Sequence, residues 1–123
     1  MQLDISRNNL AYYGQDISGV KALADALSVS ASVTSLSLGR NSLGDEDVTA
    51  ICEAVQSNKE TKLASLDIQY NRVGPAGAKS VAAMVAVIAS VSRLDARVNR
   101  LGDEGEAILR EAVKEKPGFE LLL

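Results

Sequence analysis

An eight-residue pattern occurs four times along the 123 residues of this chain and limits the folds that the chain can adopt. Each copy has the form Leu-x-Leu-x-x-Asn-x-Leu, with other aliphatic residues at some Leu positions. The copies begin at Leu3, Leu36, Leu66 and Leu94, so their starts are 33, 30 and 28 residues apart. Self-similarity at a period of about 20–50 residues indicates a repeat array, in which each unit packs mainly on its neighbours.

The second half of each unit carries a helical pattern. It starts at Gly19, Asp47, Gly77 and Gly105, and small or aliphatic residues recur four, seven and eight positions later. Those positions share one face of an α-helix. We therefore predict one domain over residues 1–123, with strand-helix repeats at approximately 1–33, 34–63, 64–91 and 92–123.

The spacing of Leu and Asn in all four copies resembles leucine-rich repeats of the longer, ribonuclease-inhibitor-like type that NOD-like receptors also carry. The resemblance covers essentially the whole chain, and one departure is Ala96, where the fourth copy should have a larger aliphatic residue. It implies an α/β fold, a curved right-handed α/β solenoid or horseshoe segment. It implies no particular activity. After Pro117 and Gly118, residues 119–123, which are apolar except for Glu120, predict a fifth, C-terminal edge strand.

Other recurring positions are predicted to be structural. The Asn at 8, 41, 71 and 99 is expected to satisfy backbone groups at the turn after each strand. Small residues are expected where helices meet, so Cys52 is interpreted as a packing residue. In the fourth helix Glu106 and Arg110 replace apolar or small residues, which predicts a polar outer side, as in a terminal capping repeat.

The composition argues against catalysis. The chain has no His and one Cys, so the commonest general base and a thiolate metal site are both missing. We predict no enzyme activity, no catalytic residues, no metal and no cofactor. The acidic run Asp45-Glu46-Asp47 is explained by the dipole at a helix N-terminus rather than by a cation. Asp67 and Asp95 on an open sheet would lack the desolvation that acid–base chemistry needs.

The net charge and the hydropathy of the chain argue against two kinds of partner, nucleic acid and membranes. The net charge is −3 without a basic stripe, so nucleic acid is not expected as a partner. The longest apolar-rich run, 81–89, is too short to span a membrane, so no membrane association is predicted. We expect the protein to be localised in the cytoplasm.

The concave face of the sheet is the predicted binding surface, because its side chains are not used in the core. One hypothesis is a protein-binding patch, supported by the enrichment of Tyr and Arg in binding hot spots. The other is a solvated ladder of charges that compensate one another. The candidate residues are Arg40, Asp67, Tyr70, Arg93, Asp95 and Arg97.

Two further regions are candidates for contacts. Tyr12 and Tyr13 lie in an insertion after the first strand and would either contact a partner or cover the end of the core. Leu3 and Ile5 belong to a first strand with a free outer edge, which favours a homo-oligomer or a longer solenoid. Val87 and Ile88 are predicted to be exposed near a helix end and are candidates for self-association.

The sequence thus predicts a protein–protein interaction module that uses the concave face of a short repeat solenoid. The alternative is a structural or capping segment of a larger or self-associating assembly, without a separate ligand site.

Overall fold

Strands and helices alternate along the chain. The computed structural model describes residues 1–8 and 18–123. The elements in order are β1 (Gln2–Asp4), α1 (Ser18–Leu27), β2 (Ser35–Ser37), α2 (Asp45–Ser57), β3 (Ser65–Asp67), α3 (Pro75–Val87), β4 (Arg93–Asp95), α4 (Gly102–Val113) and β5 (Glu120–Leu122). This confirms the predicted strand-helix units and the fifth strand. The predicted contacts of Tyr12 and Tyr13 lie outside the described residues.

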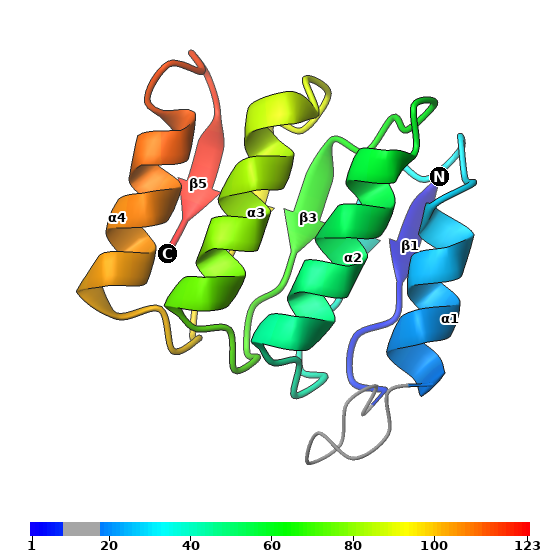
Figure 1. The fold of residues 1–123 in the computed structure, drawn as a ribbon, viewed down its shortest axis with the longest axis horizontal. Helices are drawn as coiled ribbons and strands as arrows, with labels where there is room; N and C mark the ends of the chain where they lie inside the picture. Colours follow the sequence, from blue (N-terminus) through cyan, green and yellow to red (C-terminus); the bar gives the residue numbers. More distant parts are fainter. Residues whose placement is uncertain (9–17) are drawn as a thin grey trace.

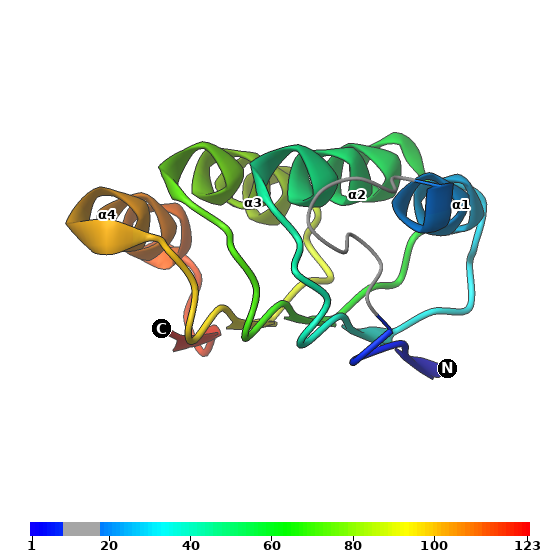
Figure 2. The ribbon, with the colours of Figure 1, turned by 90° about the horizontal axis from the view of Figure 1, so that it is seen from below.

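The five strands form one parallel sheet in the order β1-β2-β3-β4-β5. The repeats stay in register, because Leu3, Leu36, Leu66, Leu94 and Leu121 pair along the sheet. The helices lie side by side along the sheet (Figure 1). Seen from below, they form one layer over one face of the sheet, and the other face is open (Figure 2). The architecture is the predicted α/β solenoid.

The core lies between the two layers. Alternate strand residues point toward the helices, so Leu36 and Leu38 are buried, as are Leu66 and Ile68. Ala96, the departure from the repeat pattern, is buried as well. Cys52 is fully buried, and this burial, with a smaller contribution from the charge of Glu53, raises the pKa of its thiol to about 12. Cys52 is therefore a packing residue, as predicted.

The outer side of α4 is polar. Glu106 and Arg110 form an ion pair one helical turn apart, with 3.1 Å between Oε1 and Nη2. The aligned residues of α2 are Val48 and Cys52, and both are buried. The predicted contrast between α4 and the inner helices is confirmed.

The recurring Asn residues form a ladder of hydrogen bonds between repeats. Asn71 Nδ2 donates to the carbonyls of Leu38, one repeat earlier, and Ile68, in its own repeat, at 3.0 and 2.9 Å. Asn71 Oδ1 accepts from the backbone N–H groups of Asn41 and Leu43 at 3.0 and 2.9 Å. Asn99 repeats this arrangement with Ile68 and Ala96. The Asn positions are structural, as predicted.

The end of α3 differs from the prediction in one residue. Val87 is exposed, as expected, but Ile88 is half-buried and packs against the core. Ile88 is the C-cap residue of α3, where its N–H donates to the Met84 carbonyl, and the equivalent C-cap residue of α2, Asn58, is buried. The prediction that Ile88 is exposed is wrong.

Candidate functional site

The residues at the exits of the first four strands share an unusual backbone conformation. Arg7, Arg40, Tyr70 and Val98 occupy equivalent positions, and their φ angles lie between 55° and 59°. This left-handed conformation is uncommon for residues other than glycine, and for a β-branched residue such as Val98 it is an outlier. The turn before each ladder Asn imposes it. The four side chains therefore form a row along one edge of the open sheet face.

Within this row, Arg40 and Tyr70 form a stacked pair. The guanidinium carbon of Arg40 lies 3.9 Å from the centre of the Tyr70 ring, a cation–π contact between neighbouring repeats. The Tyr70 side chain remains 41% exposed and Val98 58% exposed. A hollow of about 360 Å³ lies here, lined by Arg40, Tyr70 and Val98 together with Ser42 and Asn71. The structure thus places an arginine, an aromatic ring and an aliphatic side chain together at the surface.

A second recurring arrangement lies on the strands themselves. In three repeats a strand aspartate accepts hydrogen bonds from the residue two positions later. Asp4 accepts from the N–H and hydroxyl of Ser6, at 2.9 and 2.6 Å. Asp67 accepts from the N–H and side-chain amide of Gln69, at 3.0 and 2.8 Å. Asp95 accepts from Arg97 in the same way. The second repeat lacks both groups, because it has Ser37 and Gly39 at these positions.

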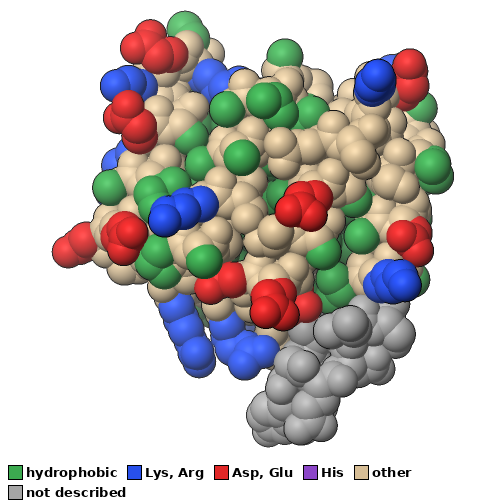
Figure 3. Space-filling view, in the orientation of Figure 1, with side chains coloured by type: hydrophobic (Ala, Val, Ile, Leu, Met, Phe, Trp, Pro, Cys, Tyr) green, Lys and Arg blue, Asp and Glu red, His purple; other side chains and the backbone are tan. Residues whose placement is uncertain are grey.

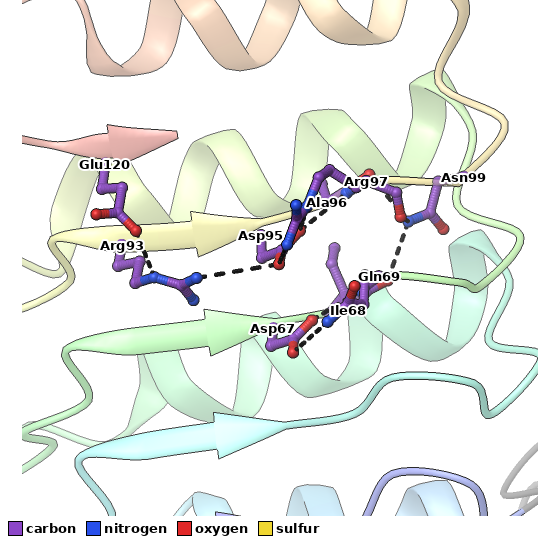
Figure 4. Close-up of polar contacts among 9 residues, drawn as sticks. All are labelled: Asp67, Ile68, Gln69, Arg93, Asp95, Ala96, Arg97, Asn99 and Glu120. Atoms are coloured by element: carbon purple, nitrogen blue, oxygen red, sulfur yellow. Dashed lines mark hydrogen bonds and ion pairs between the residues drawn. The ribbon is translucent and has the colours of Figure 1, made fainter. Parts of the chain in front are cut away.

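Asp95 is the most strongly held of these aspartates. Arg97 approaches it with two nitrogens, with Nη2 2.8 Å from Oδ2 and Nε 3.0 Å from Oδ1. Arg93 lies on the other side, 4.0 Å away, and its Nε donates to Glu120 of β5 at 2.6 Å. Figure 4 shows Arg93 between Glu120 and Asp95, with Arg97 over the same carboxylate. The Asp95 side chain is consequently only 1% exposed.

This arrangement resolves the repulsion expected between Asp67 and Asp95, which pair directly across β3 and β4. Burial alone would raise the pKa of Asp95. The hydrogen bonds from the Arg97 side chain and N–H, with the charges of Arg97 and Arg93, outweigh burial and hold the pKa below its usual value. The same contact affects Arg97, because its side-chain hydrogen bond to Asp95 and the attraction between the two charges raise the pKa of the guanidinium.

The Asp95 cluster makes the stability depend on pH. A carboxyl whose pKa is lowered by folding stabilises the fold above its unfolded pKa of ~3.9, and this contribution is lost as the pH falls through the folded pKa. We expect the free energy of unfolding to fall more steeply below about pH 4 in the wild type than in Asp95→Asn. Urea unfolding at pH 7, 4 and 3 measures this difference. Glu104→Gln, which removes an exposed carboxylate of α4, is the control, and an equal pH slope in wild type and Asp95→Asn would contradict the expectation.

The predicted site residues fall into two groups. Arg93, Asp95 and Arg97 form the ion-pair cluster with Asp67 beside it, and Arg40 and Tyr70 form the stacked pair. Because Asp95 is covered by its own arginines, it positions them rather than facing solvent. Sequence analysis did not identify Glu120 as a site residue. The repeat register predicts its position, because it places Glu120 at the start of the fifth strand, beside Arg93.

Asp45, the first residue of the acidic run 45–47, has a structural role. Asp45 Oδ1 accepts from the N–H groups of Gly74 and Gly77, at 2.7 and 2.9 Å, and so binds the N-terminus of the following helix. Among the described residues, no group of three His, Cys, Asp or Glu side chains could hold a metal ion. In the same part of the chain, none of the helices has the length and apolarity needed to cross a membrane.

Comparison with known proteins agrees with this geometry. A family model described as a leucine-rich repeat matches residues 29–52 and 59–82. Three relatives carry the name NACHT, LRR and PYD domains-containing protein. Mouse protein 12 is 34% identical over 92 residues, bovine protein 5 is 35% identical over 101, and human protein 13 is 36% identical over 94. These matches cover 75%, 82% and 76% of this chain, but 9% of each relative.

The repeated motif, the parallel sheet with its single helical layer and the family match together define a leucine-rich-repeat protein. Its repeats are of the type found in NOD-like receptors, as the resemblance indicated. The chain spans about 9% of the length of these relatives. Repeats of this kind typically serve as protein-interaction modules and are typically not catalytic.

Proposed function

We propose that the chain is a protein-binding module whose partner contacts the open face of the sheet around Tyr70. The observation that carries this proposal is the exposed stack of Arg40 on Tyr70, with Val98 beside it. Tyr and Arg are enriched among residues that contribute most to binding energy, and an aromatic ring combines a large contact area with a polar end. The nearby Arg97 adds a charged group held in place by Asp95.

The opposite face, which the helices cover, shows apolar side chains interspersed with acidic and basic ones (Figure 3). As part of the same proposal, the buried free thiol of Cys52 is consistent with a reducing, cytoplasmic setting, and a protein rather than nucleic acid or a membrane is the partner.

Removal of the Tyr70 ring tests the proposal. We expect Tyr70→Ala to weaken binding of a protein captured by the immobilised chain at least ~30-fold, because a central hot spot contributes about 2 kcal/mol or more. Proteins that bind the immobilised chain are identified by mass spectrometry, and the affinity of each for wild type and variant is then measured by titration calorimetry. Lys79→Ala, at an exposed position of α3, is the control and should leave affinity unchanged. Unchanged melting temperatures exclude an effect through folding.

A structural or assembly role is the second candidate. Ala22 and Ala26 of α1 are exposed, whereas the aligned Ala50 and Ala54 of α2 pack against the core. The outer side of α1 thus has the small residues of an inner helix, and the nearby Leu3 and Ile5 are half-buried at the edge strand β1. Equal capture by wild type and Tyr70→Ala would reject the first proposal and favour this one.

A further inference from the structure

A hollow in the open face lies where the second repeat departs from the others. It is lined by residues of the first three repeats and has a volume of about 220 Å³. Its lining residues are Ser6, Arg7, Ser37, Gly39, Arg40, Asp67, Gln69 and Tyr70. The equivalent positions of Gly39 in the neighbouring repeats carry the side chains of Ser6 and Gln69. The hollow exists because Gly39 contributes no side chain to this row.

Cations without an ion-pair partner surround this hollow. Arg7 and Arg40 form no ion pair with any described residue, although Arg40 stacks on Tyr70. Arg93, Arg97 and Arg110 are each paired with a carboxylate. Arg72 and Arg100 also form no ion pair with a described residue, but they do not line this hollow. The second repeat has no aspartate on its strand, since Ser37 stands where the other repeats have Asp4, Asp67 and Asp95. Two guanidinium groups therefore border a hollow to which the second repeat contributes no carboxylate, although Asp67 of the third repeat lines it.

Asp67 is the acidic residue among those that line the hollow, and Gln69 holds it in place. Both oxygens of Asp67 accept hydrogen bonds from Gln69, one from its N–H and one from its side-chain amide. The groups left to bind a ligand are the donors of Arg7 and Arg40 and the hydroxyls of Ser37 and Tyr70. The two guanidinium groups outnumber the single carboxylate of Asp67 in the lining, which favours an anion, and a guanidinium matches a carboxylate with two parallel hydrogen bonds.

We propose that this hollow, which we name the Gly39 hollow, receives an aspartate or glutamate side chain of the protein partner. The inference rests on the proposed function and names the chemistry of the partner at that surface: an acidic segment whose carboxylate lies between Arg7 and Arg40 and beside the Tyr70 ring. The partner thus supplies the carboxylate that the second repeat lacks. A partner with a basic or uncharged segment at this place would leave both guanidinium groups unpaired.

We expect substitution of Gly39 to close the hollow and to keep the fold. A Cβ at Gly39 would lie 3.5 Å from Gln69 Cγ and 3.9 Å from Ser6 Cβ, both ordinary contacts. Gly39→Gln thus introduces the side chain that Gln69 has one repeat later. We expect it to keep the melting temperature and to exclude the ligand. Gly39→Ser, which adds only a hydroxymethyl group, is a second variant should the longer side chain disturb packing.

The probe is a capped peptide, acetyl-Glu-Glu-Leu-Glu-Glu-amide, titrated into the full ¹⁵N-labelled chain. The matched peptide has Gln in place of each Glu. We expect the Glu peptide to shift the amide resonances of Gly39, Arg40 and Tyr70 and the Gln peptide to bind at least about tenfold more weakly. Arg7→Gln combined with Arg40→Gln should weaken the Glu peptide at least about tenfold, and Gly39→Gln should abolish the shifts. Lys79→Gln removes one positive charge on α3 and should have no such effect.

Three results would overturn the inference. They are equal binding of the two peptides, shifts confined to residues away from the hollow, and full binding of the Glu peptide by the Arg7→Gln/Arg40→Gln chain. If the Glu peptide fails while Tyr70→Ala still abolishes capture of a partner, the acidic-partner inference falls and the proposed function stands. If capture does not depend on Tyr70, the proposed function itself falls, whatever the peptides do.

Discussion

Asn71→Ala is expected to lower the free energy of unfolding by about 3–5 kcal/mol. The Asn71 side chain donates to the carbonyls of Leu38 and Ile68, and it accepts from the N–H groups of Asn41 and Leu43. Alanine removes all of these bonds and leaves backbone groups buried without partners, each at a cost of about 1–3 kcal/mol. Urea denaturation followed by circular dichroism at pH 7 measures the loss.

The first Asn of the ladder provides a matched control. Asn8 is exposed, and its side-chain amide donates to the carbonyls of Ile5 and Ser6. Water can replace these bonds at the surface, so Asn8→Ala should cost about 1 kcal/mol or less. If Asn71→Ala leaves too little folded chain to measure, Asn71→Ser, which keeps one polar group, extends the series. Equal destabilisation by the Asn8 and Asn71 variants would contradict the structural role of the ladder.

The fold was predictable because the strand positions of the repeat have similar surroundings in successive units. Leu36, Leu66 and Leu94 meet the same neighbours, so their spacing alone indicates a parallel sheet in register. The same argument identified Glu106 and Arg110 as residues of an outer surface. It failed at Ile88 because the polar residue at the aligned position, Asn58, indicated exposure, whereas Asn58 is itself buried.

The sequence predicted which residues make up the candidate site but not how their side chains are arranged. The sequence placed Asp67 beside Asp95 and arginines nearby, because residue order on parallel strands sets which side chains are adjacent. It could not show that Arg97 and Arg93 cover Asp95 to 1% exposure, since this depends on how two long side chains are oriented. Nor could it show that Arg40 stacks on Tyr70 instead of pairing with an acid. The hollow at Gly39 is visible only when its neighbouring repeats are seen around it.

Val48→Glu is expected to destabilise the chain by about 3–5 kcal/mol, because it buries a carboxylate without a partner and removes a packed aliphatic side chain. Val48 is 1% exposed within the core of the helix layer. The aligned residue of α4 is Glu106, whose side chain is 38% exposed and paired with Arg110. The same side chain at the same position of the repeat should therefore be costly in α2 and harmless in α4, since only the neighbours differ.

The reciprocal variant, Glu106→Val, isolates this effect of position. It removes an exposed ion pair within one helix, which contributes about 0.3–0.5 kcal/mol, so the free energy of unfolding should change by no more than about that amount. Both variants are compared with the wild type by urea denaturation at pH 7. A large loss for Glu106→Val would mean that the outer side of α4 stabilises the fold through its polar groups. A small loss for Val48→Glu would mean that the packing of α2 against its neighbours is loose enough to hydrate a carboxylate, contrary to the burial of Val48.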